Sequence, residues 1–143
     1  MNYKLVKSTF SDIERLIYYK INTIFEYAAD LSDEEVNKIN NYVKSEVPKL
    51  LKNYYNIVIN DTIVGCLLLV DKDDGILLEE IYLEVEYRNK GIGTDILKKI
   101  LNDNDIVYLW VYKDNIKAIS LYKKLGFIVI QETKYRFYMK YNK

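Results

Sequence analysis

The stretch Glu86-Tyr87-Arg88-Asn89-Lys90-Gly91-Ile92-Gly93-Thr94 decides the fold of this chain, because an apolar run precedes it and an amphipathic helical pattern follows it. Two glycines beside the first turn of the expected helix let the backbone approach a ligand closely. The unpaired N–H groups of that turn and the positive end of the helix dipole favour an anion. The stretch therefore predicts a cradle for phosphate or pyrophosphate.

The spacing R-x-x-G-x-G differs from two commoner phosphate loops. A dinucleotide fingerprint needs G-x-G-x-x-G, and a Walker loop needs G-K-[ST] after its second glycine. Neither is present. The alternative is that the two glycines only form a tight connection between a strand and a helix. A second segment favours the ligand-binding interpretation: Asp114-Asn115-Ile116-Lys117-Ala118-Ile119-Ser120-Leu121-Tyr122-Lys123-Lys124-Leu125-Gly126-Phe127, which follows the apolar run Ile106–Val111.

Together, R-x-x-G-x-G and the downstream N-x-x-A-x-x-x-Y-x-x-x-G-F resemble the Gcn5-related N-acetyltransferase (GNAT) superfamily, in which the two segments build the acetyl-CoA site. The resemblance is strong from Leu77 to Phe127 and covers the first half only in the order of its elements. It implies an acyltransferase that moves the acetyl group of acetyl-CoA to a primary amine of a small molecule or protein, by direct attack in a ternary complex. The alternative is a non-catalytic acyl-CoA-binding sensor or interaction module.

Length and composition agree with a single acetyltransferase domain over residues 1–143, because 50% of the residues are apolar and can form one core. The formal net charge is zero, which argues against nucleic acid as a partner. The chain has no histidine, so Ser-His and Cys-His catalysis and the usual zinc sites are excluded, and no metal is expected. The lone Cys66 is interpreted as a core residue. Without an export signal or a long apolar run, the expected location is cytoplasmic, with no membrane partner.

Periodicity and capping signals predict alternating strands and helices. Capping boxes at Ser11–Glu14 and Ser32–Glu35 begin two helices, and Pro48 is expected to kink or divide the second. Two further helices are expected from Gly91 to about Asn102 and after Asn115. The expected strands are Tyr3–Val6, Tyr55–Ile59, Ile63–Val70, Ile76–Val85, Ile106–Val111 and closing strands through Tyr138. This order predicts an α/β (α+β) fold: a mixed, mostly antiparallel GNAT-like sheet of about seven strands flanked by about four helices. By resemblance, its central parallel strands splay apart.

The resemblance also implies which residues contact acetyl-CoA. Backbone N–H groups of the glycine-rich stretch take the pyrophosphate, and main-chain groups of Leu83 and Val85 pair with the pantetheine arm like an added strand. Asn115 can cap its helix and contact the cofactor as well. The expected cofactor-binding residues are Leu83, Val85, Arg88, Asn89, Lys90, Gly91, Ile92, Gly93, Thr94 and Asn115.

For the reaction, the resemblance implies that the N–H of Leu83 polarises the thioester carbonyl and that Tyr122 protonates the departing thiolate. The alternative for Tyr122 is an aromatic packed on the buried face of its helix. A base must deprotonate the amine, and the candidates are Glu79 and Glu80. Strand alternation and the family pattern select Glu79. A bulge could switch the choice to Glu80, and both glutamates could instead be solvated or paired with lysines.

The acceptor is not specified by the sequence. The region of the first two helices carries the acidic residues Glu26, Asp30, Asp33, Glu34 and Glu35. These carboxylates could attract a cationic amine, or they could only complement helix dipoles. The resemblance also makes a homodimer through the closing strands an expectation.

Overall fold

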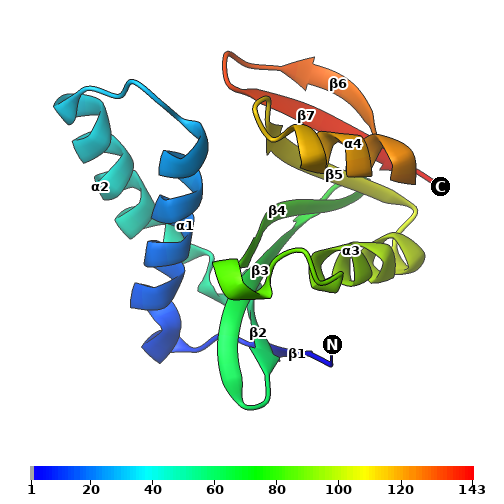
Figure 1. Cartoon of the computed structure of the whole chain (residues 1–143), viewed down its shortest axis with the longest axis horizontal. Coiled ribbons are helices and arrows are strands. Elements are labelled where there is room, and N and C mark those ends of the chain that lie inside the picture. The colour runs from blue at the N-terminus through cyan, green and yellow to red at the C-terminus, as the bar shows by residue number, and fades with distance from the viewer. Residues whose placement is uncertain (1) are drawn as a thin grey trace. The chain divides into compact units, whose positions relative to one another are not determined.

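The computed structural model describes residues 2–143, which form a seven-stranded sheet with the strand order β1-β2-β3-β4-β5-β7-β6 (Figure 1). The pairs β1–β2, β2–β3, β5–β7 and β6–β7 are antiparallel, whereas β4 and β5 pair in parallel. Four α-helices accompany the sheet within residues 2–143. The predicted α/β fold with a mostly antiparallel sheet is therefore confirmed.

The strands are β1 (Lys4–Lys7), β2 (Tyr54–Ile59), β3 (Thr62–Lys72), β4 (Gly75–Leu83), β5 (Ile106–Tyr112), β6 (Ile128–Glu132) and β7 (Arg136–Asn142). The helices are α1 (Ile13–Tyr27), α2 (Asp33–Lys49), α3 (Ile92–Asp103) and α4 (Ile116–Leu125), with short 3₁₀ turns η1 (Phe10–Asp12), η2 (Leu51–Asn53) and η3 (Val85–Tyr87). Within residues 2–143, no helix is both long enough and apolar enough to span a bilayer.

The chain divides into two compact units, whose boundaries fall within β3, within β4 and between Lys90 and Gly91. The first contains the described residues up to Leu68 together with Glu80–Lys90, and the second contains Leu69–Glu79 and Gly91–Lys143. The single domain expected over the whole chain stays a prediction.

In the first unit, a two-residue turn joins β2 to β3. Asn60 and Asp61 both have left-handed backbone angles, with φ of 49° and 64°. Such angles are what a type I′ hairpin turn requires, and Asn and Asp tolerate them better than most residues. The pairing of Ile59 with Thr62 closes the hairpin.

The start of α1 differs from the prediction. The capping box lies at Thr9 and Asp12, where the Asp12 carboxylate accepts the Thr9 N–H at 2.8 Å, and not at Ser11 and Glu14. Asp12 is buried, and its carboxylate also accepts a hydrogen bond from Asn56 of β2 at 2.9 Å. This contact is far in sequence, so local spacing alone could not rank the two possible boxes.

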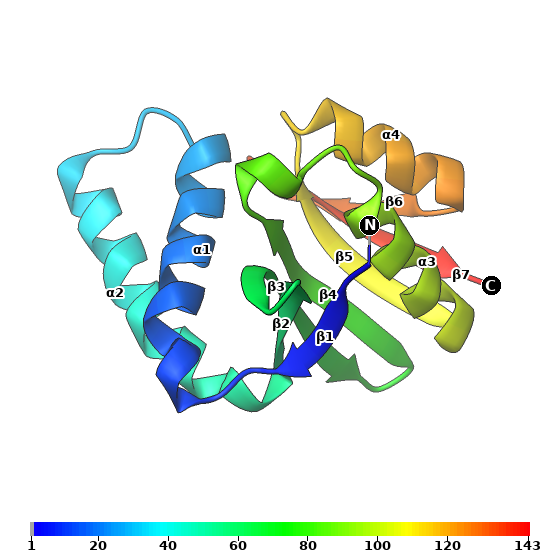
Figure 2. The same ribbon diagram turned by 60° about the horizontal axis from the view of Figure 1, so that its bottom comes forward.

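Helix α2 begins as predicted and passes through its proline. The Ser32 hydroxyl accepts the Glu35 N–H at 3.1 Å, and the Glu35 carboxylate accepts the Ser32 N–H at 3.1 Å. The helix is continuous through Pro48 and ends one residue later, so the proline ends it and does not divide it. Helices α1 and α2 lie side by side in Figures 1 and 2.

The second unit shows strict strand alternation in β5. Val107, Leu109 and Val111 are buried, whereas the residues between them are partly exposed. Helix α3 buries an apolar face that includes Ile96, Leu97, Ile100 and Leu101. Helix α4 lies alongside the β5–β7–β6 part of the sheet (Figure 2), and β7 extends beyond the predicted end at Tyr138 to Asn142.

Strand β4 ends earlier than predicted. Leu83 is its last residue, and Val85, expected on the strand, begins the 3₁₀ turn η3 with 72% of its surface exposed. The turn starts because the Tyr87 N–H bonds to the Glu84 carbonyl at 2.9 Å. The placement of Val85 on the strand is therefore wrong, and its main-chain pairing with a cofactor stays a prediction. Pairing of β4 with β5 covers Ile76–Leu78. The splay beyond stays a prediction.

Candidate functional site

The N-terminus of α3, in the second unit, is open to a ligand. Gly91 caps the helix with φ of 86°, and a methyl group added there would meet nothing within 4 Å. Gly91 has no side chain with which to cap the helix, and the Asp95 N–H makes a helical bond to the Gly91 carbonyl at 3.0 Å. The N–H groups of Ile92, Gly93 and Thr94 lie in the first turn, where the helix itself offers no acceptor. This geometry fits an anion.

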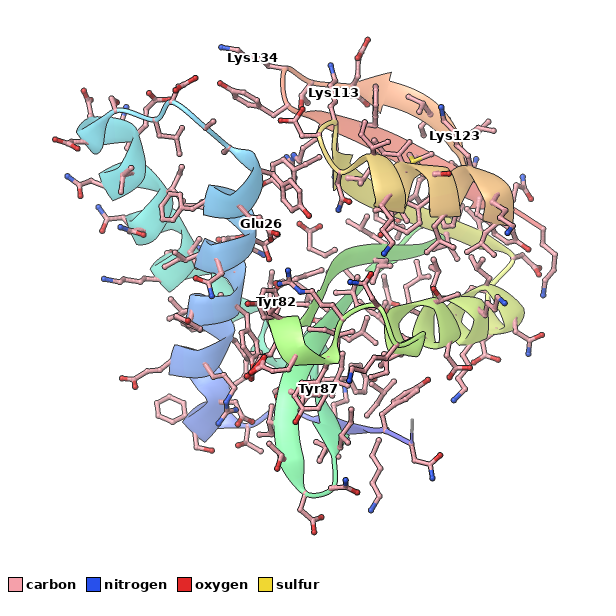
Figure 3. The ribbon with its side chains drawn as sticks, viewed as in Figure 1. Glu26, Tyr82, Tyr87, Lys113, Lys123 and Lys134 are labelled. Atoms are coloured by element: carbon pink, nitrogen blue, oxygen red, sulfur yellow. The ribbon has the colours of Figure 1, made fainter. Side chains whose placement is uncertain are left out.

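Arg88, in the first unit, has partners that the sequence did not indicate. Its Nε donates to the Leu83 carbonyl at 2.7 Å, its Nη1 lies 3.4 Å from a Glu26 oxygen, and its guanidinium stacks 5.2 Å from the centre of the Tyr82 ring. Figure 3 shows Glu26 and Tyr82 on α1 and β4 of this unit. Arg88 thus ties the end of β4 to α1, and its predicted role beside a phosphate stays a prediction. Asn89 follows with a left-handed φ of 60°.

The Tyr82–Leu83 peptide lies against Gly65 of β3. A Cβ built on Gly65 would sit 2.0 Å from the Tyr82 carbonyl oxygen and 3.2 Å from the Leu83 Cα. Only glycine permits this approach. The Leu83 N–H, which the resemblance assigns to the thioester carbonyl, belongs to this same peptide group. The close contact with Gly65 therefore fixes the plane of the peptide group that carries the Leu83 N–H, the candidate donor.

Glu80 lies in a buried polar cluster of the first unit. Its carboxylate accepts the Tyr54 hydroxyl at 2.8 Å and the Cys66 thiol at 3.3 Å, and the Lys20 ammonium lies 3.8 Å away. Burial, followed by the nearby Glu80 charge, raises the pKa of the Cys66 thiol. Cys66 is buried as predicted. For Glu80, the alternative of pairing with a lysine is confirmed, and the alternative of a solvated side chain is wrong.

Glu79, in the second unit, lies on an aromatic face of the sheet. Because Leu78 pairs with the buried Leu109, the next side chain along β4 faces the opposite side. Burial is the main cause that raises the pKa of Tyr112 and of Tyr138, and the Glu79 charge raises both further. The face continues with Trp110, whose ring lies 4.4 Å from that of Tyr138.

The second sequence motif forms both ends of α4. The Asn115 side chain accepts the Ala118 N–H at 3.3 Å, which confirms the predicted cap. At the other end, Gly126 has φ of 112°, its N–H bonds to the Lys123 carbonyl, and the Phe127 N–H bonds to the Tyr122 carbonyl. This is a Schellman motif, which is commonly accompanied by an apolar contact across it.

That apolar contact involves Tyr122 itself. The rings of Tyr122 and Phe127 are 5.7 Å apart, and Tyr122 is only partly buried. The spacing Y-x-x-x-G-F therefore has a structural cause in addition to any catalytic one. The packing alternative for the Tyr122 ring is supported, while the role of its hydroxyl stays a prediction.

A hollow of about 410 Å³ lies in the first unit between α1 and the segment that follows β4. It is lined by Arg15, Tyr18, Tyr19, Asn22, Tyr82, Glu84, Val85 and Glu86. The sequence alone did not indicate this hollow, although its four α1 residues have the i, i+3, i+4, i+7 spacing of one helix face. Their partners lie sixty or more residues away in the sequence, as in the Tyr19–Glu84 hydrogen bond of 2.6 Å with a separation of 65.

Comparison with known sequences identifies the family. The family model described as "Acetyltransferase (GNAT) family" matches residues 17–127. The chain is 35% identical over 80 residues to the uncharacterized N-acetyltransferase YobR of Bacillus subtilis (strain 168), a match that covers 52% of this chain and 32% of that protein. It is 35% identical over 63 residues to the uncharacterized N-acetyltransferase MJ1207 of Methanocaldococcus jannaschii, covering 41% and 28%. The match thus spans about a third of each of these relatives.

Solved structures share the fold. The PaiA N-acetyltransferase from Thermoplasma acidophilum, determined in complex with coenzyme A, superposes over 100% of both chains with a TM-score of 0.79 and 23% identity. The ribosomal-protein-S18-alanine N-acetyltransferase from Escherichia coli covers 99% of this chain and 94% of its own, with a TM-score of 0.69 and 17% identity. Together with the family model, the shared fold leads to one conclusion. This chain belongs to the GNAT acetyltransferase family.

Proposed function

We propose that this protein is an N-acetyltransferase that transfers the acetyl group of acetyl-CoA to a primary amine, by direct attack in a ternary complex. The observation that carries the proposal is the open N-terminus of α3 behind Gly91, at the position of the family motif. Acetyl-CoA, when bound, supplies the activated acetyl thioester. Everything else must come from the side chains and backbone of the protein.

Cofactor binding is assigned residue by residue. The first unit would contribute Leu83, Val85, Arg88, Asn89 and Lys90, and the second would contribute Gly91, Ile92, Gly93, Thr94 and Asn115. The first-turn N–H groups and the helix dipole favour the negatively charged pyrophosphate. Because Arg88 is already bonded to Leu83 and Glu26, the backbone would provide most of the anion binding.

Two groups would act on the thioester. The Leu83 N–H would donate to the carbonyl oxygen as negative charge develops there, and such backbone donors stabilise transition states effectively. The Tyr122 hydroxyl would give its proton to the departing sulfur. Its ring is held by the contact with Phe127, which limits the positions that the hydroxyl can take.

For the base that deprotonates the amine, the contacts favour Glu79 over Glu80. The Glu80 carboxylate already accepts two hydrogen bonds and lies near the Lys20 ammonium in a buried cluster. Taking a proton would require it to give up these interactions. Glu79 is partly exposed and has room to exchange protons with water.

Replacing Tyr122 with phenylalanine tests the acid role. Tyr122→Phe keeps the ring that packs against Phe127 and removes only the hydroxyl. We expect amine-dependent thiol release from acetyl-CoA to slow by about tenfold or more, the usual range for lost acid catalysis. Acetyl-CoA affinity, measured by calorimetry, should stay nearly unchanged.

Tyr141→Phe is the matched control, because the Tyr141 ring also packs against Phe127, at 5.6 Å. It should leave turnover unchanged. Equal losses of turnover and affinity in Tyr122→Phe would contradict the acid role. Binding of acetyl-CoA by the unmodified protein without thiol release from any amine would support the alternative of a non-catalytic sensor.

A homodimer is part of the proposal. Strand β6 ends the strand order of the sheet, and all five of its residues are exposed, including Ile128, Val129 and Ile130. An apolar edge strand of this kind can pair with a second copy. Sedimentation analysis should show a dimer that Ile130→Lys shifts to monomer; a monomer at all concentrations would refute it. The cytoplasmic location stays a prediction.

A further inference from the structure

The hollow between α1 and the end of β4 carries a negative charge. Glu84 and Glu86 contribute two carboxylates, and the only cation in its lining is Arg15. The Arg15 guanidinium is 2.6 Å from the Asp12 carboxylate, so its charge is already balanced within the unit. The remaining charges favour a cationic ligand and disfavour an anionic one such as a CoA phosphate.

One of these carboxylates is held in a fixed position. The Tyr19 hydroxyl donates to Glu84 Oε2 at 2.6 Å, and the Tyr19 ring stacks on Tyr82 with 4.5 Å between the ring centres. Burial, together with the Glu84 charge, raises the pKa of Tyr19, so the phenol remains the donor in this pair. A carboxylate oriented by a short hydrogen bond offers its second oxygen to a ligand in a defined direction.

The rest of the lining suits an organic cation with an apolar body. Tyr18 is 61% exposed, so its ring is accessible to an alkyl chain or to a cation–π contact. Val85 adds an exposed aliphatic surface beside it. The volume of about 410 Å³ lies within the range of small-molecule sites.

The charge of the hollow determines which nitrogen of a substrate it can hold. Carboxylates stabilise the protonated form of an amine, and a protonated amine has no lone pair with which to attack a thioester. The hollow therefore suits a nitrogen that does not react. Glu84 follows Leu83 directly, so a ligand held here would lie one residue from the proposed carbonyl donor.

We propose that the hollow of Tyr18, Tyr19, Glu84 and Glu86 binds the non-reacting ammonium of an alkyl diamine or polyamine whose other nitrogen is acetylated. This inference rests on the proposed function. At the reacting end, the ammonium first gives one proton to the base. The nitrogen then forms a bond to the acetyl carbon as the C–S bond breaks, and the departing sulfur takes a proton from the acid. The second proton of the nitrogen returns to the deprotonated acid through water, and the base releases the first proton to solvent. A carboxylate on the amine would be repelled, so amino acids are poor ligands.

The test measures binding without turnover. The full chain is titrated calorimetrically with 1,4-diaminobutane, with the uncharged 1,4-butanediol of similar length and with ornithine, in the absence of acetyl-CoA. The diamine should bind at least about tenfold more tightly than either of the others. Glu84→Gln and Glu86→Gln, which keep the side-chain shape, should each weaken diamine binding about fivefold or more.

Asp61→Asn is the matched control, because it removes one carboxylate from an exposed hairpin turn of the same unit and suits the left-handed backbone there. It should change diamine affinity less than twofold, and thermal melting should show that all three variants fold. Equal binding of the diamine and the uncharged diol, or unchanged affinity in both glutamine variants, would overturn the inference. Acetyl-CoA titration and thiol release are measured separately. Failure of the diamine test would therefore not refute the proposed acetyltransferase activity. Failure of the activity test would likewise not be mistaken for failure of diamine binding.

Discussion

At the scale of single residues, Gly65 has the clearest consequence for the proposed chemistry. The Tyr82 carbonyl approaches it more closely than any side chain would allow, and that carbonyl shares a peptide group with the Leu83 N–H. Nothing in the apolar run around Gly65 distinguishes it as a positioning residue. Its importance depends on which backbone lies opposite, and only the pairing of distant strands determines that.

Gly65→Ala should therefore reduce activity more than stability explains. The added methyl group would be 2.0 Å from the Tyr82 oxygen, so the peptide must move. We expect a loss of about 1–3 kcal/mol in the free energy of unfolding, typical of overpacking. Amine-dependent thiol release by the folded fraction should fall about tenfold to a hundredfold, because small misplacements of catalytic groups are costly.

Gly75→Ala provides the control for this prediction. Its Cβ would lie 2.3 Å from the Ile106 carbonyl oxygen, a similar clash at the other end of β4. Gly75→Ala should destabilise the protein by a similar amount. The turnover of its folded fraction should stay within about twofold of the unmodified protein, because Gly75 is distant in sequence from Leu83. Equal turnover losses in both variants would refute a specific role for Gly65.

At the scale of elements, the start of α1 shows how one carboxylate joins a helix to a strand. Asp12 accepts hydrogen bonds from the Thr9 N–H, from Asn56 and from Arg15. Burial alone would raise the pKa of Asp12, but these three donors outweigh it and the pKa is lowered. The helix cap and the contact between α1 and β2 therefore depend on the same charge.

Asp12→Asn should destabilise the protein by about 1–3 kcal/mol at pH 7, because buried partners lose a charged acceptor. A lowered pKa means that the stabilisation is present above the unfolded value near 3.8 and disappears as the pH falls through the folded value. Urea unfolding at pH 7 and pH 3 should show a smaller acid-induced loss in Asp12→Asn than in the unmodified protein. Glu14→Gln, on the exposed side of the same helix, should change neither value by more than about 0.5 kcal/mol.

At the scale of the whole molecule, stability should decline at alkaline pH because of a buried thiol. The folded state raises the pKa of Cys66 well above the value of 9.0 for an unperturbed thiol, so the folded protein keeps a proton that the unfolded chain releases. This contribution is complete below about pH 9 and is lost as the pH rises. At pH 10, one such group removes about 1.4 kcal/mol from the free energy of unfolding.

Cys66→Ser isolates this contribution, since serine keeps a donor for Glu80 and does not titrate. The difference in unfolding free energy between pH 7 and pH 10 should be about 1.4 kcal/mol smaller in the variant. Denaturant titration at the two pH values measures it. An identical alkaline loss in both proteins would show that the thiol is not responsible.

The sequence by itself determined the features that depend on neighbours along the chain. The caps at Ser32 and Asn115, the turn at Asn60 and Asp61, and the glycine before α3 are set by backbone sterics and local hydrogen bonds, which act over a few residues. The element order and the two motifs were therefore sufficient for the family and the fold.

Only the tertiary structure decided which polar groups meet. The bonds of Arg88 to Leu83 and Glu26, the cluster around Glu80, and the hollow that joins Tyr19 to Glu84 bring together residues from different elements. Periodicity reports which face of a helix or strand a side chain occupies, but it does not report what lies opposite. Those partners are fixed by strand register and helix packing, so the acceptor side of the site could not be predicted from the sequence.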